Sequence, residues 1–178
     1  VLAELGGAGL PQADLCRAAG VGPAVIKTLV AQGVLAEGEV PRDLPYPRLD
    51  PGWGGRALSP DQSAAAAVLR AGVRQGGYGT TLLKGVTGSG KTEVYLDAVA
   101  EVLEQGRQAL VLLPEIALTA DFLARVEARF GALPGEWHSG VTPAERRRLW
   151  RMTAEGGVGL VVGARSALFL PFRDLALI

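Results

Sequence analysis

From residue 57 onward, amphipathic stretches alternate with short, almost continuous apolar runs. The amphipathic stretches have the spacing of helices, and the apolar runs have the length of strands that are buried on both faces. The pattern predicts helices over 58–73, 91–106, 118–131 and 142–156, and strands over 79–86, 108–114, 158–164 and 175–178. Strands that alternate with helices form a parallel sheet covered on both faces, so the predicted fold class is α/β.

The first 40 residues follow a different pattern. Two short helices are predicted over 11–20 and 23–33, each with a proline in its first turn and a glycine at its end. Together with a hairpin over 34–40, they predict a small winged-helix-like domain over residues 1–40. Such a helix pair is also typical of a plain packing unit, and its second helix carries a single cation, Lys27, where a DNA-reading helix needs more.

Residues 41–56 separate these two patterns. They contain four prolines and three glycines, the composition of a linker or of an extended segment laid over a neighbour. The predicted organisation is therefore a winged-helix-like domain over 1–40, a linker over 41–56 and an α/β domain over 57–178.

Composition narrows the function classes only slightly. Lys plus Arg equals Asp plus Glu at 18 each, so net charge does not indicate a polyanionic partner. The single Cys16 excludes an internal disulfide framework and a cysteine-rich metal site within this chain. No apolar run approaches the roughly 18 residues of a membrane span, and no signal peptide is apparent, which favours the cytoplasm. Because the chain begins at Val1 and stops inside a predicted strand, we expect it to be part of a longer protein.

The sequence "GVTGSGKT" satisfies the phosphate-loop pattern G-x-x-x-x-G-K-[ST]. The glycines allow backbone N–H groups to turn toward an anion, and the following helix N-terminus adds to that site. Lys91 would reach the phosphates of ATP, and the Thr92 hydroxyl would bind Mg²⁺. The predicted nucleotide-binding residues of the loop are Gly85, Val86, Thr87, Gly88, Ser89, Gly90, Lys91 and Thr92. The alternative is a glycine-rich turn without a ligand, and many classes of ATPase share such a loop.

The order of several further motifs resembles the first motor lobe of superfamily 2 helicases, and more narrowly the bacterial primosomal replication-restart helicases. The segments that carry the resemblance are "LSPDQ", "LLKGVTGSGKTEVY", "LLPEIALT", "HSG" and "VGARSALFLPF". It implies a RecA-like fold and an ATP-dependent 3′-to-5′ DNA helicase that restarts stalled forks and initiates primosome assembly. The implied partners are forked or single-stranded DNA and other replication-restart proteins. The family also implies Zn²⁺, bound outside this chain.

The resemblance assigns roles beyond the phosphate loop. Gln62 would read the adenine edge, although Ser59 and Gln62 also form the sequence pattern of a capping box. Thr119 would contact DNA or cap the next helix, and Glu115 would pair with a cation or cap the same helix. Arg165 and Ser166 would contact DNA phosphates, with a structural salt bridge as the alternative. The family usually has threonine where this chain has Ala164, which removes one hydroxyl.

The remaining candidates receive structural interpretations. His138 has no carboxylate partner apparent in the sequence, so we expect a structural or DNA-adjacent role. Trp137 and Trp150 are expected to pack rather than to stack on bases. The run "ERRRLWR" is expected to be a solvated helix face, with the steering of DNA as the alternative. The resemblance places the hydrolytic D-E-E-H motif just after the last residue. We therefore expect this chain to bind nucleotide weakly and not to hydrolyse it. An ATPase or transport protein that does not act on DNA, and a DNA-binding module with a vestigial ATPase, remain alternatives.

Overall fold

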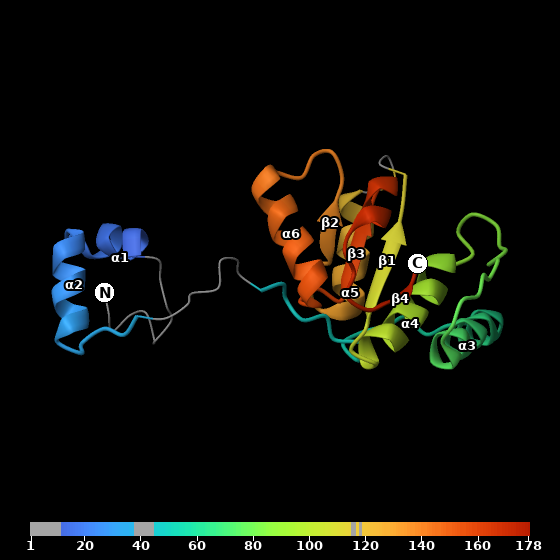
Figure 1. Ribbon diagram of the computed structural model, residues 1–178. Coiled ribbons are helices and arrows are strands. Elements are labelled where there is room, and N and C mark those ends of the chain that lie inside the picture. Colours follow the sequence, from blue (N-terminus) through green and yellow to red (C-terminus); the bar gives the residue numbers. More distant parts are fainter. Residues whose placement is uncertain (1–11, 38–44, 115–116, 118) are drawn as a thin grey trace. The chain divides into compact units, whose positions relative to one another are not determined.

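The computed structural model describes residues 12–37, 45–114, 117 and 119–178 (Figure 1). The chain divides into two compact units, residues 1–44 and 45–178. In the first unit, α1 (Gln12–Ala19) and α2 (Pro23–Ala31) are joined by a turn in which Gly20 has a positive φ of 66°. The two short helices predicted here are therefore present. The predicted hairpin wing lies partly outside the described residues, and its described part, 34–37, contains no strand.

The second unit is built on a four-stranded parallel sheet with the order β2-β3-β1-β4. Its strands are β1 (Gln108–Leu112), β2 (Gly135–Trp137), β3 (Leu160–Gly163) and β4 (Leu175–Leu177). Its helices are α3 (Pro60–Gln75), α4 (Lys91–Glu104), α5 (Ala120–Phe130) and α6 (Pro143–Glu155), with the 3-10 helix η2 (Arg165–Phe169). The predicted α/β class is confirmed.

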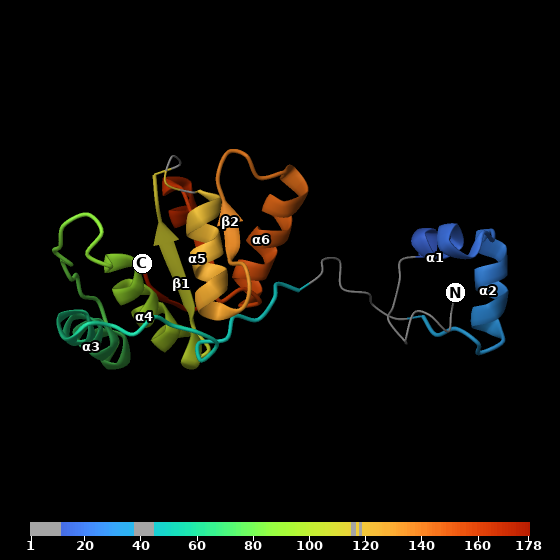
Figure 2. The same ribbon diagram turned by 180° about the vertical axis from the view of Figure 1, so that it is seen from behind.

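The strands place alternate side chains on the two faces of the sheet. Ala109, Leu160 and Val162 pack with α4 and α5 on one face, while Leu110 and Val161 pack with α6 and η2 on the other. Figures 1 and 2 show α6 and α5 on opposite sides of the strands. The sheet is thus covered on both faces, as its nearly continuous apolar strands predict.

The strand predicted over 79–86, just before the phosphate loop, is wrong for this structure. These residues form no strand, and Leu82 is 77% exposed. An apolar run forms a strand only where another strand supplies hydrogen-bond partners. None of the described strands pairs with residues 79–86. Conversely, β2 is not indicated by the sequence pattern, because "GEW" is too short to show alternation.

The described part of the proline- and glycine-rich segment, 45–56, packs on the second unit. Leu49 is buried in the core, the Asp50 N–H donates to the Phe130 carbonyl at 2.9 Å, and the Trp53 ring lies against Gly131. Figure 2 shows the segment passing one end of α5 on its way to α3. The composition of 41–56 suggests either a linker or an extended segment laid over a neighbour. Its described part, 45–56, is the second of these. None of the described helices is long and apolar enough to cross a membrane.

An ion pair joins α3 to α4. Arg74 donates to Glu101 at 2.6 Å, and this guanidinium holds the pKa of the buried Glu101 carboxyl below its ordinary value of 4.5. A carboxyl whose pKa is depressed by folding contributes stability above its unfolded pKa and loses that contribution as pH falls through the folded value.

We therefore expect the free energy of unfolding to fall as the solution is acidified below about pH 4.5, and Arg74→Gln to flatten this dependence. Urea titrations at several values between about pH 3 and pH 7 measure it. Arg56→Gln, at an exposed position, is the control with the same charge change. Equal acid-side slopes for the two variants would contradict the role of the pair.

Candidate functional site

The phosphate loop leads into the N-terminus of α4, which begins at Lys91. Gly88 and Gly90 have φ values of 81° and 79°, a region that other residues rarely adopt. A Cβ at Gly90 would also collide with the Gln62 amide, and one at Gly85 with the Ser89 hydroxyl. Backbone conformation thus favours glycine at positions 88 and 90, as expected for a loop whose N–H groups surround an anion.

Lys91 is the first residue of α4, and its side chain folds back over the loop. Its Nζ donates to the carbonyl oxygens of Gly85 at 2.7 Å and Val86 at 2.9 Å. Both bonds are solvent-exposed, so a phosphate can replace them at small cost in free energy. The ammonium is thus held beside the position where the loop and the helix N-terminus favour negative charge.

Gln62 connects α3 to the phosphate loop. Its Oε1 accepts from the Ser59 N–H at 2.8 Å, and Ser59 Oγ accepts from the Gln62 N–H at 3.3 Å, so the capping box is formed. Its Nε2 donates to the Ser89 carbonyl at 2.8 Å. An amide has two hydrogens and two oxygen lone pairs. Gln62 therefore keeps one donor and one acceptor for a ligand, and its predicted adenine contact stays a prediction.

Thr92 lies in the first turn of α4, next to Lys91. Burial raises the pKa of the neighbouring Tyr95 hydroxyl, while a hydrogen bond with Thr92 opposes this increase. Tyr95 itself packs against the core of the second unit. An oxygen ligand beside phosphate oxygens suits Mg²⁺, which is normally bound by one or two protein oxygens together with substrate phosphates.

The predicted DNA-contacting residues lie after the carboxyl ends of two neighbouring strands, β1 and β3. Thr119 caps α5, with its Oγ1 accepting from the Phe122 N–H at 3.3 Å. Arg165 is exposed at the start of η2, directly after β3, and has no ion-pair partner among the described residues. The Ser166 hydroxyl accepts from Trp137 Nε1 at 3.2 Å. Glu115 lies outside the described residues.

His138 has a carboxylate partner after all. Its Nε2 lies 3.4 Å from Glu136 Oε2, and its Nδ1 accepts from the Gly140 N–H at 3.2 Å, which assigns the ring proton to Nε2. Residues two apart along a strand share a face, so the spacing of Glu136 and His138 was the available signal. Both line a hollow with Tyr46 and Glu145, whose side chains are themselves hydrogen-bonded at 2.6 Å. The structural or DNA-adjacent role expected for His138 stays a prediction.

The two tryptophans differ in their surroundings. Trp137 is 9% exposed and belongs to the core between the sheet and α6, as predicted. Trp150 is 48% exposed on α6 and lies 6.3 Å from Trp137 between ring centroids, so it packs only in part. On the same helix Arg148 pairs with Glu145 at 3.0 Å and stacks on the Tyr46 ring. The "ERRRLWR" helix is therefore not uniformly solvated.

Comparisons with known proteins agree with this geometry. Residues 59–176 match the DEAD/DEAH box helicase family. The whole chain is 39% identical to "Replication restart protein PriA" of Bacillus subtilis over 180 residues, which is 22% of that protein. The proteins of the same name from Synechocystis and Chlamydia pneumoniae are 38% and 41% identical over 93% and 68% of this chain. The resemblance inferred from the motifs is confirmed. The chain spans between 16% and 22% of the length of these relatives.

Proposed function

The chain belongs to the DEAD/DEAH box helicase family, and from this premise we propose that it is the nucleotide-binding part of an ATP-dependent 3′-to-5′ DNA helicase acting in replication restart. The observation that carries the proposal is the phosphate loop, with Gly88 and Gly90 in the left-handed region and Lys91 folded over it. The name shared by the similar proteins, replication restart protein, supports the process.

ATP and Mg²⁺ fit the residues present. Lys91 and the N–H groups of the loop and of the first turn of α4 would hold the phosphates, with Gln62 beside the loop to contact adenine. Thr92 would bind Mg²⁺, which neutralises phosphate charge when bound. The residues of this chain would bind and orient the triphosphate. The glycine positions leave the space that this requires.

DNA would lie along the ends of β1 and β3. Arg165 offers an exposed guanidinium, and Thr119 lies at the N-terminus of α5, where backbone N–H groups favour a phosphate. Ser166 would contribute its hydroxyl from the same surface. Forked or single-stranded DNA and the proteins that act in replication restart are the proposed partners, and the cytoplasm is the proposed location. An ATPase or transport protein that does not act on DNA gains no support from the comparisons.

Unwinding by the longer protein that carries these residues tests the proposal. We expect an ATP-dependent separation of forked DNA with a 3′ single-stranded tail, and little with a 5′ tail. A strand-displacement assay with both substrates measures it, with ATP omitted as the control. Equal unwinding without ATP, or none with either fork, would contradict the proposal.

A separate prediction concerns Gln62. Gln62→Ala should weaken ATP binding by about fivefold, since one hydrogen bond contributes roughly 0.5–1.5 kcal/mol. If Gln62 contacts adenine, the preference for ATP over GTP falls. If it only holds the loop through Ser89, both affinities fall equally. Fluorescence titrations with both nucleotides separate these cases.

The matched control for this prediction is Ser59→Ala. It removes the other hydrogen bond of the same capping box but leaves the Gln62 amide bonded to Ser89. Both variants should lose about 1 kcal/mol of unfolding free energy, while only Gln62→Ala should lose nucleotide affinity. If Ser59→Ala loses as much nucleotide affinity as Gln62→Ala, the loss comes from the capping box of α3 and not from the Gln62 amide.

A further inference from the structure

The outer face of α6 forms, with β2, a groove in which aromatic rings alternate with guanidinium groups. We propose that this α6 groove binds single-stranded DNA, with one base stacked on Trp150 and the adjacent phosphates held by Arg146 and Arg147. The inference rests on the proposed function and adds a binding surface to it. The lining residues are Trp137, Arg146, Arg147, Trp150, Arg151 and Ala154.

Helical spacing produces this composition. Positions 146, 147, 150, 151 and 154 recur at intervals of three and four residues, so they share one face of α6. The opposite face carries Leu149, which is fully buried, and Arg148, which is paired with Glu145. One face of the helix is thus used to hold the fold together. None of the α6 residues that line the groove is a buried core residue.

Of the two tryptophans that line the groove, Trp137 is buried at its base and Trp150 is exposed to solvent. Trp137 is nearly buried, its Nε1 donates to Ser166, and the Arg146 guanidinium lies 4.5 Å from its ring centroid. Trp150 lies 6.3 Å from Trp137, between ring centroids, and is 48% exposed. A base that stacks on an exposed aromatic ring buries apolar area and needs no particular sequence.

The charge of the groove suits a phosphate chain. All of its lining residues except the tryptophans and Ala154 are arginines, and none is acidic. Among the described residues, no carboxylate pairs with Arg146 or Arg147. The nearest acidic residue along the helix, Glu145, is engaged with Arg148 and Tyr46. Guanidinium groups bind phosphate oxygens well and also stack on bases, so both parts of a nucleotide find a matching group.

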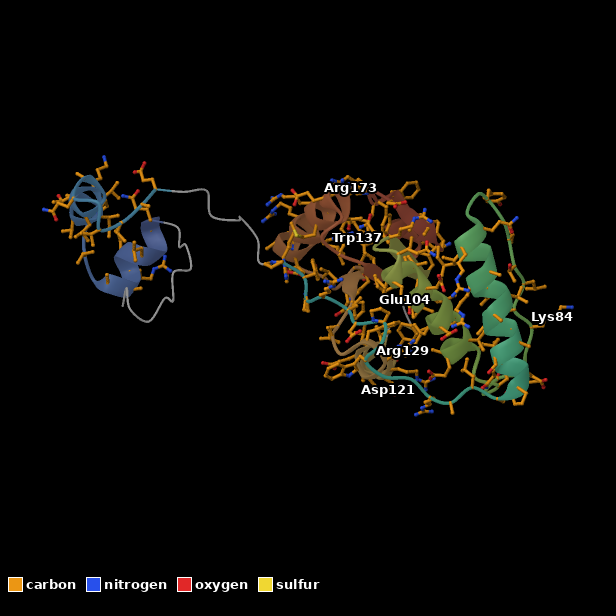
Figure 3. All side chains as sticks on the ribbon, turned by 90° about the horizontal axis from the view of Figure 1, so that it is seen from below. Lys84, Glu104, Asp121, Arg129, Trp137 and Arg173 are labelled. Carbon is orange, nitrogen blue, oxygen red and sulfur yellow. The ribbon has the colours of Figure 1, made fainter. Side chains whose placement is uncertain are left out.

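The groove is continuous with the surface proposed for DNA. The Trp137–Ser166 hydrogen bond joins its floor to η2, whose first residue is the exposed Arg165. Trp137 ends β2 and Arg165 follows β3, and these two strands are neighbours in the sheet. Trp137 and Lys84, which immediately precedes the phosphate loop, lie on different sides of the unit in Figure 3. DNA in the groove would therefore extend from η2 away from the nucleotide.

Binding of a twelve-residue oligothymidylate to this chain, followed by tryptophan fluorescence, tests the inference. Trp53→Phe serves as the background, so that Trp137 and Trp150 are the remaining emitters. We expect the oligonucleotide to quench the emission, and Trp150→Ala to weaken binding by about tenfold. An oligonucleotide of the same length without bases should bind more weakly and quench little.

A second variant is independent of the tryptophan. Arg147→Gln should lower the dependence of log affinity on log salt concentration by about 0.7, the value for one single-strand phosphate contact. Arg56→Gln and Tyr78→Ala, at exposed positions outside the groove, are the matched controls and should bind as the background does. Trp150→Phe should retain most of the affinity.

The outcomes separate the two proposals. If the background binds the oligonucleotide and both Trp150→Ala and Arg147→Gln bind equally well, the groove is not the site, while the proposed DNA helicase stands. If the oligonucleotide without bases binds as tightly as the oligothymidylate, no base stacks on Trp150. If the background binds an oligoglutamate peptide but no DNA, or binds neither, both the groove and the DNA-binding part of the proposed function are wrong.

Discussion

Replacing Lys91 with alanine is expected to reduce the affinity of the chain for MgATP by between about 10-fold and 150-fold. The estimate follows from the roughly 1.5–3 kcal/mol contributed by a hydrogen bond to a charged group. Without nucleotide, the Lys91 ammonium bonds only to exposed carbonyl oxygens of the loop. The variant should therefore unfold at nearly the same urea concentration as the wild type. Calorimetric titration with ATP at fixed salt and Mg²⁺ concentration measures the change.

Lys84→Ala is the matched control for this experiment. Lys84 is an exposed lysine directly before the loop, so its loss changes net charge and local sequence composition in the same way. It should bind MgATP within about twofold of the wild type, because an exposed charge that does not contact the phosphates is screened by solvent and salt. Similar losses in both variants would mean that general electrostatic attraction dominates. If Lys91→Ala binds MgATP as tightly as the wild type, the phosphate loop is not the nucleotide-binding site.

Replacing Gln108 with leucine is expected to lower the free energy of unfolding by about 2–3 kcal/mol, since a buried polar group left without a partner costs roughly 1–3 kcal/mol. Gln108 is buried at the start of β1. Its Nε2 donates to the carbonyl oxygens of Thr153 at 3.1 Å and Val158 at 2.9 Å. Its Oε1 accepts from the N–H groups of Arg173 at 2.8 Å and Asp174 at 3.1 Å.

Leucine keeps the approximate volume, so this variant isolates the lost hydrogen bonds from cavity formation. Urea unfolding at neutral pH is the measurement, and Gln75→Leu on the exposed surface of α3 is the control, expected to change stability by less than about 0.5 kcal/mol. A loss below about 1 kcal/mol for Gln108→Leu would show that water or local rearrangement satisfies these groups.

The helices of the second unit were predictable because their signals are local. Ser59, Thr119 and Thr142 each cap a helix through a bond to a backbone N–H three residues later. Gly131 and Gly156 end helices in the left-handed region. Strands are less local, because an extended run needs a partner strand. That is why residues 79–86 were predicted wrongly and β2 was missed.

The candidate site divides in the same way. The phosphate loop follows from a sequence of eight adjacent residues, Gly85–Thr92, because its chemistry depends on consecutive backbone groups. The Gln62–Ser89 bond spans 27 residues and the Trp137–Ser166 bond spans 29. Neither has a periodic signal in the sequence. The same is true of the four carbonyl and N–H groups that meet at Gln108.

The sequence by itself determined the α/β class, the helices, the phosphate loop and the family resemblance, because each is written in residues that are neighbours along the chain. Only the tertiary structure decided that residues 45–56 pack on the second unit, that Gln62 both caps α3 and holds the loop, and that Trp150 is exposed beside Arg146 and Arg147. These features depend on which surfaces remain uncovered after the sheet and its helices have packed. Burial and pairing between distant residues are properties of the folded chain as a whole.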